Sequence, residues 1–146
     1  MNLFLSMQIS SSGLSSQRTV LRVIAENMAN VQTTRTEEGG PYLRKRAVLS
    51  PAPVPSSFPE LLFSRMRPEA LGVNVTEIVE DPYGLKTVFD PSHPDADETG
   101  LVLLPNVNLM EEMVSLLSAS RVYEANVAAF NAAKSMALRA LEIGSK

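Results

Sequence analysis

Apolar and polar positions alternate with a seven-residue period at both ends of the chain, and proline is absent from both. All ten prolines lie between Pro41 and Pro105, so that residues 1–40 and 106–146 contain none. Because proline removes a helical hydrogen bond and clashes with the preceding turn, these two ends are the segments that can form long helices. The pattern predicts a helix, an irregular strand-rich middle and a second helix.

The N-terminal stripe has spacings that alternate between three and four residues, as in the seam of a coiled coil. Its positions are Met7, Ser10, Leu14, Gln17, Leu21, Ile24, Met28 and Val31. We expect a helix from about Met7 to Ala29 with a frayed beginning, since Gly13 weakens a helix by up to about 1 kcal/mol.

The C-terminal stripe is longer and more regular. It comprises Leu109, Met113, Leu116, Ser120, Tyr123, Val127, Phe130, Lys134, Ala137 and Leu141, and a parallel row of Met110, Leu117 and Leu138 widens it. Asn108 with Glu111 resembles a capping box at its start, and Gly144 is a natural stop. Roughly 35 helical residues at 1.5 Å each predict a rod about 50 Å long, too long for so small a domain to cover alone.

The middle of the chain is β-like and rich in turns. Short alternating or β-branched runs predict strands over Leu43–Ser50, Val73–Val79, Leu85–Phe89 and Leu101–Leu104. Turn residues such as Asp81-Pro82, Tyr83-Gly84 and Asp90-Pro91 separate them. Four prolines within residues 51–59 indicate a polyproline-biased loop or exposed linker.

These elements predict an α+β fold in which long terminal helices form a coiled-coil pair beside a small β-rich middle region. We expect residues 1–35 to form the N-terminal helix, 36–105 the middle with a Pro-rich loop at 51–71, and 106–146 the C-terminal helix. Isolated helices are marginal in water, and the wide C-terminal stripe leaves apolar surface to cover. We therefore expect the ends to be weakly ordered in a free subunit and to become firm on assembly.

Composition narrows the classes of function. A net charge of −3 argues against a nucleic-acid surface, and the short basic run Arg44-Lys45-Arg46 is typical of a solvated or interface-facing strand edge. The chain contains no cysteine, which excludes disulfides and thiolate chemistry. Neither a cleavable secretion signal nor an apolar stretch long enough to span a bilayer is expected.

Candidate chemistry is sparse. The single histidine, His93, lies in an acidic loop, and Asp95-x-Asp97 resembles the first half of a calcium loop, but position twelve is Asn106 rather than glutamate. Nucleophile-elbow and phosphate-binding glycine patterns are absent. The Glu111-Glu112 pair is interpreted as a solvated helix flank. We expect no enzyme activity, cofactor, metal or small-molecule substrate.

Two asparagines three residues apart lie beside the N-terminal stripe, in Ala25-Glu26-Asn27-Met28-Ala29-Asn30-Val31-Gln32-Thr33. From the residues alone they are polar surface, a C-terminal αL stop, or a device that fixes helix register. The stretch also resembles the Asn-Leu-Ala-Asn-x-x-Thr signature of bacterial flagellar axial proteins, with Met28 in place of leucine.

Four further stretches resemble, within that group, the proximal rod family of the flagellar basal body. They are Phe89–Asp97, Pro105–Asn108, Glu112–Val114 and Ala119–Val127. The similarity covers almost the whole chain apart from residues 51–71. It implies a structural subunit of the axial drive shaft, exported without signal cleavage by the flagellar type III apparatus, and located in the rod that spans the periplasm.

The resemblance also implies partners: copies of the same chain, other rod proteins, the export apparatus and the inner-membrane ring. We expect the assembly seam to consist of Leu14, Leu21, Ile24, Asn27, Met28, Asn30, Leu109, Met113, Leu116, Tyr123, Asn126, Val127 and Phe130. The alternative is a soluble coiled-coil adaptor or secretion chaperone, which would explain the helices without polymerisation.

Overall fold

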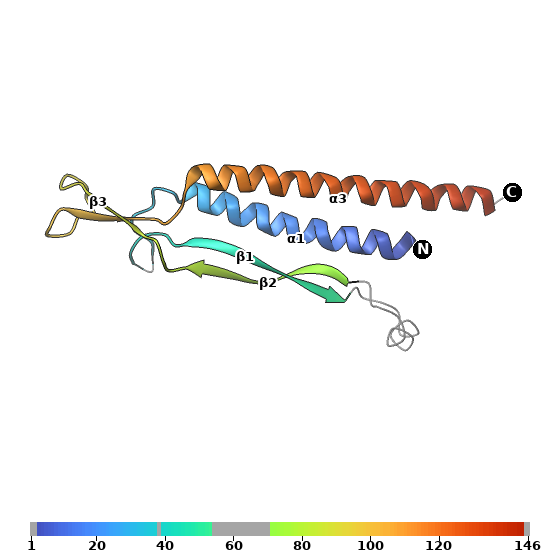
Figure 1. Cartoon of the computed structure of the whole chain (residues 1–146), viewed down its shortest axis with the longest axis horizontal. Coiled ribbons are helices and arrows are strands. Elements are labelled where there is room, and N and C mark those ends of the chain that lie inside the picture. The colour runs from blue at the N-terminus through green and yellow to red at the C-terminus, as the bar shows by residue number, and fades with distance from the viewer. Residues whose placement is uncertain (1–2, 38, 54–70, 145–146) are drawn as a thin grey trace. The chain divides into compact units, whose positions relative to one another are not determined.

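A computed structural model describes residues 3–37, 39–53 and 71–144, and Figure 1 shows its helices and strands. Helix α1 spans Leu3–Ala29 and helix α3 spans Leu109–Gly144. Between them lie β1 (Arg44–Pro53), β2 (Leu71–Asp81), β3 (Lys86–Phe89) and β4 (Leu101–Leu104). The predicted α+β class, with long terminal helices and a small β-rich middle, is confirmed. Most of the Pro-rich loop expected at 51–71 lies outside the described residues.

The helix boundaries follow from local chemistry. At the start of α3 the Met110 N–H donates to Asn108 Oδ1 (3.1 Å), while Asn108 Nδ2 donates to Glu111 Oε1 (3.1 Å). The side chain of Asn108 therefore satisfies a backbone donor that the first helical turn leaves free. Helix α1 begins at Leu3, about one turn before the expected Met7, so Gly13 does not prevent a regular helix there.

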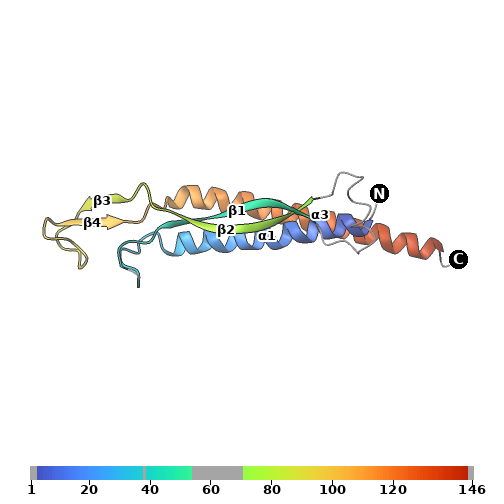
Figure 2. The ribbon, with the colours of Figure 1, turned by 90° about the horizontal axis from the view of Figure 1, so that it is seen from below.

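The strands form two separate two-stranded sheets, β1–β2 and β3–β4. β3 and β4 pair antiparallel, with Val88 opposite Val102 and Phe89 opposite Leu101, and Figure 2 shows them side by side. β1 continues beyond the predicted Ser50 through Pro51 to Pro53. Pro51 and Pro53 lie an even number of residues after Lys45, so their nitrogens face the same side of the strand as the Lys45 N–H. That N–H donates to Asn27 and points away from β2. The two prolines therefore lie at positions where no N–H is needed for pairing with β2.

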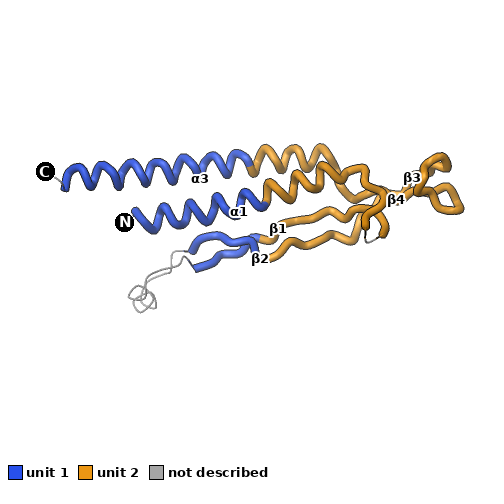
Figure 3. The backbone as a smooth tube through the Cα atoms, turned by 180° about the vertical axis from the view of Figure 1, so that it is seen from behind, with its two compact units in different colours: residues 1–19, 49–76, 120–146 blue, residues 20–48, 77–119 orange. Residues whose placement is uncertain are grey.

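The chain divides into two compact units, coloured separately in Figure 3. Unit 1 takes residues 1–19, 49–76 and 120–146, and unit 2 takes residues 20–48 and 77–119. α1, α3, β1 and β2 each contribute residues to both units. The three sequence ranges expected as domains stay a prediction.

The two units have different cores. Among the described residues, unit 2 buries large apolar side chains together with two polar ones: Val23, Ile24, Asn27, Tyr42, Val102, Pro105, Val107, Glu112 and Ala119. Within the described part of unit 1, the buried residues are all small, namely Ser10, Ser16, Gly72 and Ala133.

Candidate assembly site

Asn27, near the end of α1, is the centre of a buried polar cluster in unit 2. It is 1% exposed. Its Nδ2 donates to the Lys45 carbonyl (2.8 Å), and its Oδ1 accepts from the Lys45 N–H (2.9 Å). The carboxamide thus binds the backbone of β1 as a neighbouring strand would. Nδ2 also donates to Glu112 Oε2 (3.3 Å) and Oδ1 accepts from the Tyr42 hydroxyl (3.0 Å), so both donors and both acceptors are used.

Glu112, in the first turns of α3, supplies the negative charge of this cluster. Its side chain is 2% exposed, whereas that of Arg44 is 33% exposed. Arg44 Nε donates to Glu112 Oε1 (2.7 Å), and Nη2 of the same guanidinium lies 2.6 Å from that oxygen. A buried carboxylate is tolerated only when it is paired and hydrogen-bonded, and Glu112 has both kinds of partner. α1, β1 and α3 are therefore joined within unit 2 by polar contacts.

Asn106 extends the cluster toward the β2–β3 turn. Its Oδ1 accepts from the backbone N–H of Arg44 (2.8 Å), and its Nδ2 donates to the carbonyls of Asp81 (2.8 Å) and Tyr83 (2.6 Å). The turn passes close by through Gly84, whose φ of 83° favours glycine. Asn106 thus connects β1 to this turn by side-chain bonds alone.

Tyr42 closes the cluster beside β1. Burial raises its pKa to about 12, and the nearby carboxylates Glu26, Glu80 and Glu112 act in the same direction. The Lys45 ammonium lies 5.7 Å from the Tyr42 ring centroid and 3.6 Å from Glu80 Oε1. The neutral phenol therefore remains a hydrogen-bond donor to Asn27 over the physiological pH range.

Unit 1 brings α1 and α3 together at a glycine. A Cβ atom built on Gly13 would lie 3.0 Å from Asn126 Oδ1 and 3.1 Å from its Cγ. Asn126 is held in place because its Nδ2 donates to the Val122 carbonyl (3.0 Å). Gly13, which the sequence indicated only as a weak point of a helix, allows this close approach.

The acidic loop around His93 is a set of hydrogen-bonded turns. Ser92 lowers the pKa of Asp90 through its hydroxyl bond, and Thr99 does the same for Asp97. His93 Nδ1 accepts from the Asp95 N–H (3.1 Å). Among residues 3–37, 39–53 and 71–144, no group of three or more His, Asp or Glu side chains is placed to hold a metal ion.

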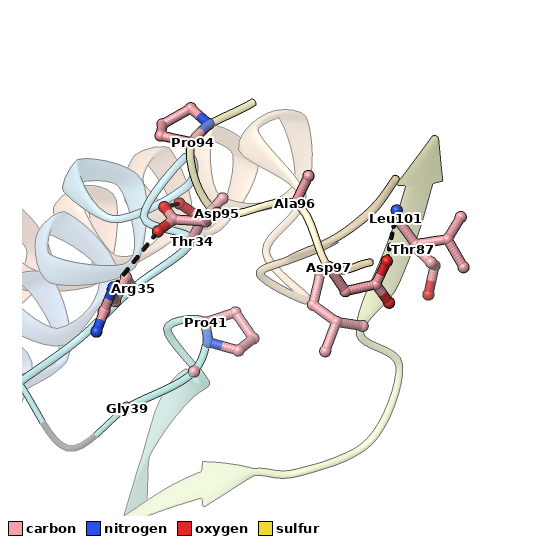
Figure 4. A pocket seen from close by; sticks show the side chains of 12 residues that line it. Thr34, Arg35, Gly39, Pro41, Thr87, Pro94, Asp95, Ala96, Asp97 and Leu101 are labelled. Atoms are coloured by element: carbon pink, nitrogen blue, oxygen red, sulfur yellow. Dashed lines mark hydrogen bonds and ion pairs between the residues drawn. The ribbon is translucent and has the colours of Figure 1, made fainter. Parts of the chain in front are cut away.

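A hollow of about 710 Å³ lies in unit 2 between the 34–41 loop, the 94–97 loop and one face of β3–β4. Figure 4 shows Asp95 on its wall, where Oδ2 accepts from the Thr34 hydroxyl (2.7 Å) and Oδ1 lies 4.0 Å from Arg35. Asp97 Oδ1 accepts from the Leu101 N–H (2.9 Å). These wall carboxylates already have hydrogen-bond or ion-pair partners within the chain.

The residues expected in the assembly seam fall into three groups by exposure. Ile24 and Asn27 are buried, and Leu109 and Met113 are exposed (39% and 40%). The others are half-buried: Leu14, Leu21, Met28, Asn30, Leu116, Tyr123, Asn126, Val127 and Phe130. Asn30 does not adopt the left-handed conformation; its Nδ2 donates to the Glu26 carbonyl and its Oδ1 accepts from Thr33.

Sequence reasoning missed several members of the cluster. The interpretation of Glu112 as part of a solvated flank is wrong: its side chain is 2% exposed, and it is bonded to the Arg44 guanidinium and to Asn27. Arg44 was assigned to a solvated or interface-facing edge, but it faces this carboxylate. The sequence offers only a spacing: Glu112 lies seven residues before Ala119 and thus shares its helix face, but only the structure shows that Ala119 is buried.

None of the helices in the described part of the chain is both long and apolar enough to cross a bilayer.

Comparison with known proteins places the chain in a family. Residues 99–143 match a family model described as flagellar basal body rod FlgEFG protein, C-terminal. The chain is 44% identical to the flagellar basal-body rod protein FlgC of Borreliella burgdorferi, over 98% of each chain. It is 42% identical to FlgC of Bacillus subtilis and 39% identical to FlgC of Yersinia enterocolitica, each over 99% of both chains. The chain belongs to the FlgC family of flagellar basal-body rod proteins.

Proposed function

We propose that this chain is a structural subunit of the proximal rod in the bacterial flagellar basal body and that it joins the axial drive shaft through its terminal helices. Membership of a family of basal-body rod proteins supports the location. The proposal that the chain assembles through its helices rests on one structural observation, an exposed apolar stripe on α3. The role is mechanical and needs no catalytic group.

The stripe lies on the part of α3 that belongs to unit 2. Met110, Val114 and Leu117 are 69%, 65% and 64% exposed, at spacings of four and three residues. Leu109 and Met113 continue the apolar surface beside them. A contiguous apolar face of this kind marks an interaction surface, because leaving it in water is unfavourable. It is the face on which we place helices of neighbouring subunits.

A second set of seam residues has a role within the chain. Leu21, on α1, and Leu116, on α3, are both half-buried in unit 2 and are assigned to the packing of the subunit itself. In unit 1, Leu138 and Leu141 are also exposed (52% and 70%), three residues apart, and form an apolar surface of their own near the end of α3.

Partners and route belong to the same proposal. Copies of this chain and other rod proteins are the neighbours along the shaft, and the inner-membrane ring and the export apparatus are the partners at its base. The subunit reaches the periplasm-spanning rod through type III export without a cleavable signal. Heterologous contacts repeated along a helical path transmit torque without an active site.

Two double variants distinguish packing within the subunit, at Leu21 and Leu116, from contacts with neighbouring subunits, at Met110 and Leu117. Met110→Asp with Leu117→Asp should leave the free energy of unfolding of the purified chain unchanged, because both side chains are exposed in the free chain. It should abolish motility and incorporation into basal bodies. Leu21→Asp with Leu116→Asp should instead destabilise the purified chain, because both side chains are half-buried.

Normal basal bodies in cells that carry the Met110→Asp, Leu117→Asp chain would show that this face is not an assembly surface. The adaptor or chaperone alternative makes a different prediction: a stable, fully helical dimer of the purified chain and none of it in purified basal bodies.

A further inference from the structure

Val73, in β2, has both of its backbone polar groups bonded to α1. Its N–H donates to Ser12 Oγ (3.1 Å), and its carbonyl accepts from the Ser16 hydroxyl (2.9 Å). The Ser12 hydroxyl in turn donates to the Ile9 carbonyl (2.7 Å), which leaves its oxygen free to accept. All of these residues lie in unit 1.

These bonds lie at a position where a strand edge would otherwise be open. In a two-stranded sheet each strand has one edge without a partner, and unpaired N–H and C=O groups there form a template for another chain. Ser12 and Ser16 satisfy both groups of one edge residue from a helix. Unit 2 uses the same principle with a different side chain, because Asn27 binds both backbone groups of Lys45 in β1.

The spacing of the serines suits this task. Residues four apart lie on one face of a helix, so Ser12 and Ser16 can reach a single residue of a strand that passes beside it. Ser16 is 3% exposed, and Gly72, next to Val73, is also buried, so only small side chains separate helix and strand here. Ser11 and Ser15 have the same spacing but are exposed.

We propose that Ser12 and Ser16 determine how copies of this chain associate, by closing the β2 edge against a second copy. With the two backbone groups of Val73 bonded to α1, a strand of a second copy cannot pair with β2 at this position. With the edge open, β2 accepts a strand of another copy, and the chain associates edge to edge. The proposal concerns the free subunit and stands apart from the place of the chain in the rod.

The test compares Ser12→Ala, Ser16→Ala with the control Ser11→Ala, Ser15→Ala in the full-length purified chain. Loss of two hydrogen bonds should raise the exchange rate of the Val73 amide about tenfold or more over the control, measured by NMR. The variant should also form concentration-dependent, β-rich oligomers that bind thioflavin T, while circular dichroism shows helix content retained. Equal exchange and equal association in the two variants, or a Val73 amide unprotected in the original chain, would overturn the proposal.

A hydroxyl-retaining variant covers the case in which the alanine pair fails to fold. Ser12→Thr, made at the half-buried position alone, keeps both hydroxyl groups, so it should protect the Val73 amide and suppress β-rich association. Association of this variant to the same extent as the alanine pair would show that the hydroxyls do not close the edge.

Discussion

The two compact units hold a strand against α1 by different means. In unit 2, Asn27 binds the β1 backbone inside a core of large apolar side chains, and the buried charge of Glu112 is paired with Arg44. In unit 1, two serine hydroxyls bind the β2 backbone, and the buried residues are small. One unit combines apolar burial with a saturated polar network, and the other has little apolar burial among its described residues.

This difference has a consequence for order in the free subunit. A buried hydrogen-bond network in which every group is paired favours a single arrangement of its side chains. Any displacement would leave a polar group unpaired in the apolar interior, which is costly. Unit 2 should therefore keep its structure without partners. Unit 1 buries Ser16 and Ala133 while Leu141 and Ile143 stay 70% and 79% exposed, so its stability should depend on neighbours that cover α3.

The largest effect is expected from Asn27→Leu. It removes the partner of the Lys45 N–H and carbonyl and of the Tyr42 hydroxyl. Unsatisfied buried groups cost about 1–3 kcal/mol each, so the free energy of unfolding should fall by about 4 kcal/mol in denaturant titration. The same substitution at exposed Asn131, also on a helix, should cost under about 1 kcal/mol. Equal losses at the two sites would remove the distinction between the units.

Arg44→Met should be more harmful than Glu112→Gln, although both break the same ion pair. Loss of Arg44 leaves a carboxylate that is 2% exposed without its cation, at a cost of about 3 kcal/mol. Loss of the carboxylate leaves a guanidinium that is 33% exposed and can be hydrated, so about 1–2 kcal/mol is expected. Chemical denaturation of both variants measures the order, and the reverse order would contradict the burial of Glu112.

In unit 1, Gly13→Leu should destabilise the chain by about 1–3 kcal/mol, as extra methylene groups do in a close contact. The reason is that Asn126 atoms already lie 3.0–3.2 Å from the position of a Cβ at residue 13. Gly144→Leu is the matched control, because nothing lies within 4 Å there. If both variants unfold at the same denaturant concentration, the helices do not meet at Gly13.

The smallest effect concerns alkaline pH. The pKa of Tyr42 is raised from 10.0 to about 12 in the folded chain, so folding favours the neutral phenol. Its contribution is fully present below about pH 10 and is lost as the pH rises through about 12. Tyr42→Phe should be slightly less stable at pH 7, by about 1 kcal/mol for the lost bond to Asn27.

The gap between Tyr42→Phe and the original chain should close as the pH rises, because phenylalanine does not titrate. Tyrosinate absorbance provides the independent measurement, in which Tyr42 should ionise with a pKa of about 12. A constant gap across the alkaline range would contradict the burial of Tyr42.

The sequence predicts the elements better than the contacts. Proline distribution locates both helices, because its steric effect is local, and Asn108 marks the start of α3 for the same reason. The burial of Glu112 could not be predicted in this way, since it depends on Arg44, 68 residues away in the chain. The role of Ser12 and Ser16 could not be predicted for a similar reason: their partner Val73 is 61 and 57 residues distant.

The most direct test is cryo-electron density of basal bodies purified from cells in which this chain is the only copy of the protein. We predict that the chain lies within the rod, with the Asn27 carboxamide on the Lys45 backbone and the Met110, Val114 and Leu117 face against helices of neighbouring subunits. Rods that lack the chain, or a subunit whose Met110–Leu117 face meets solvent, would contradict it.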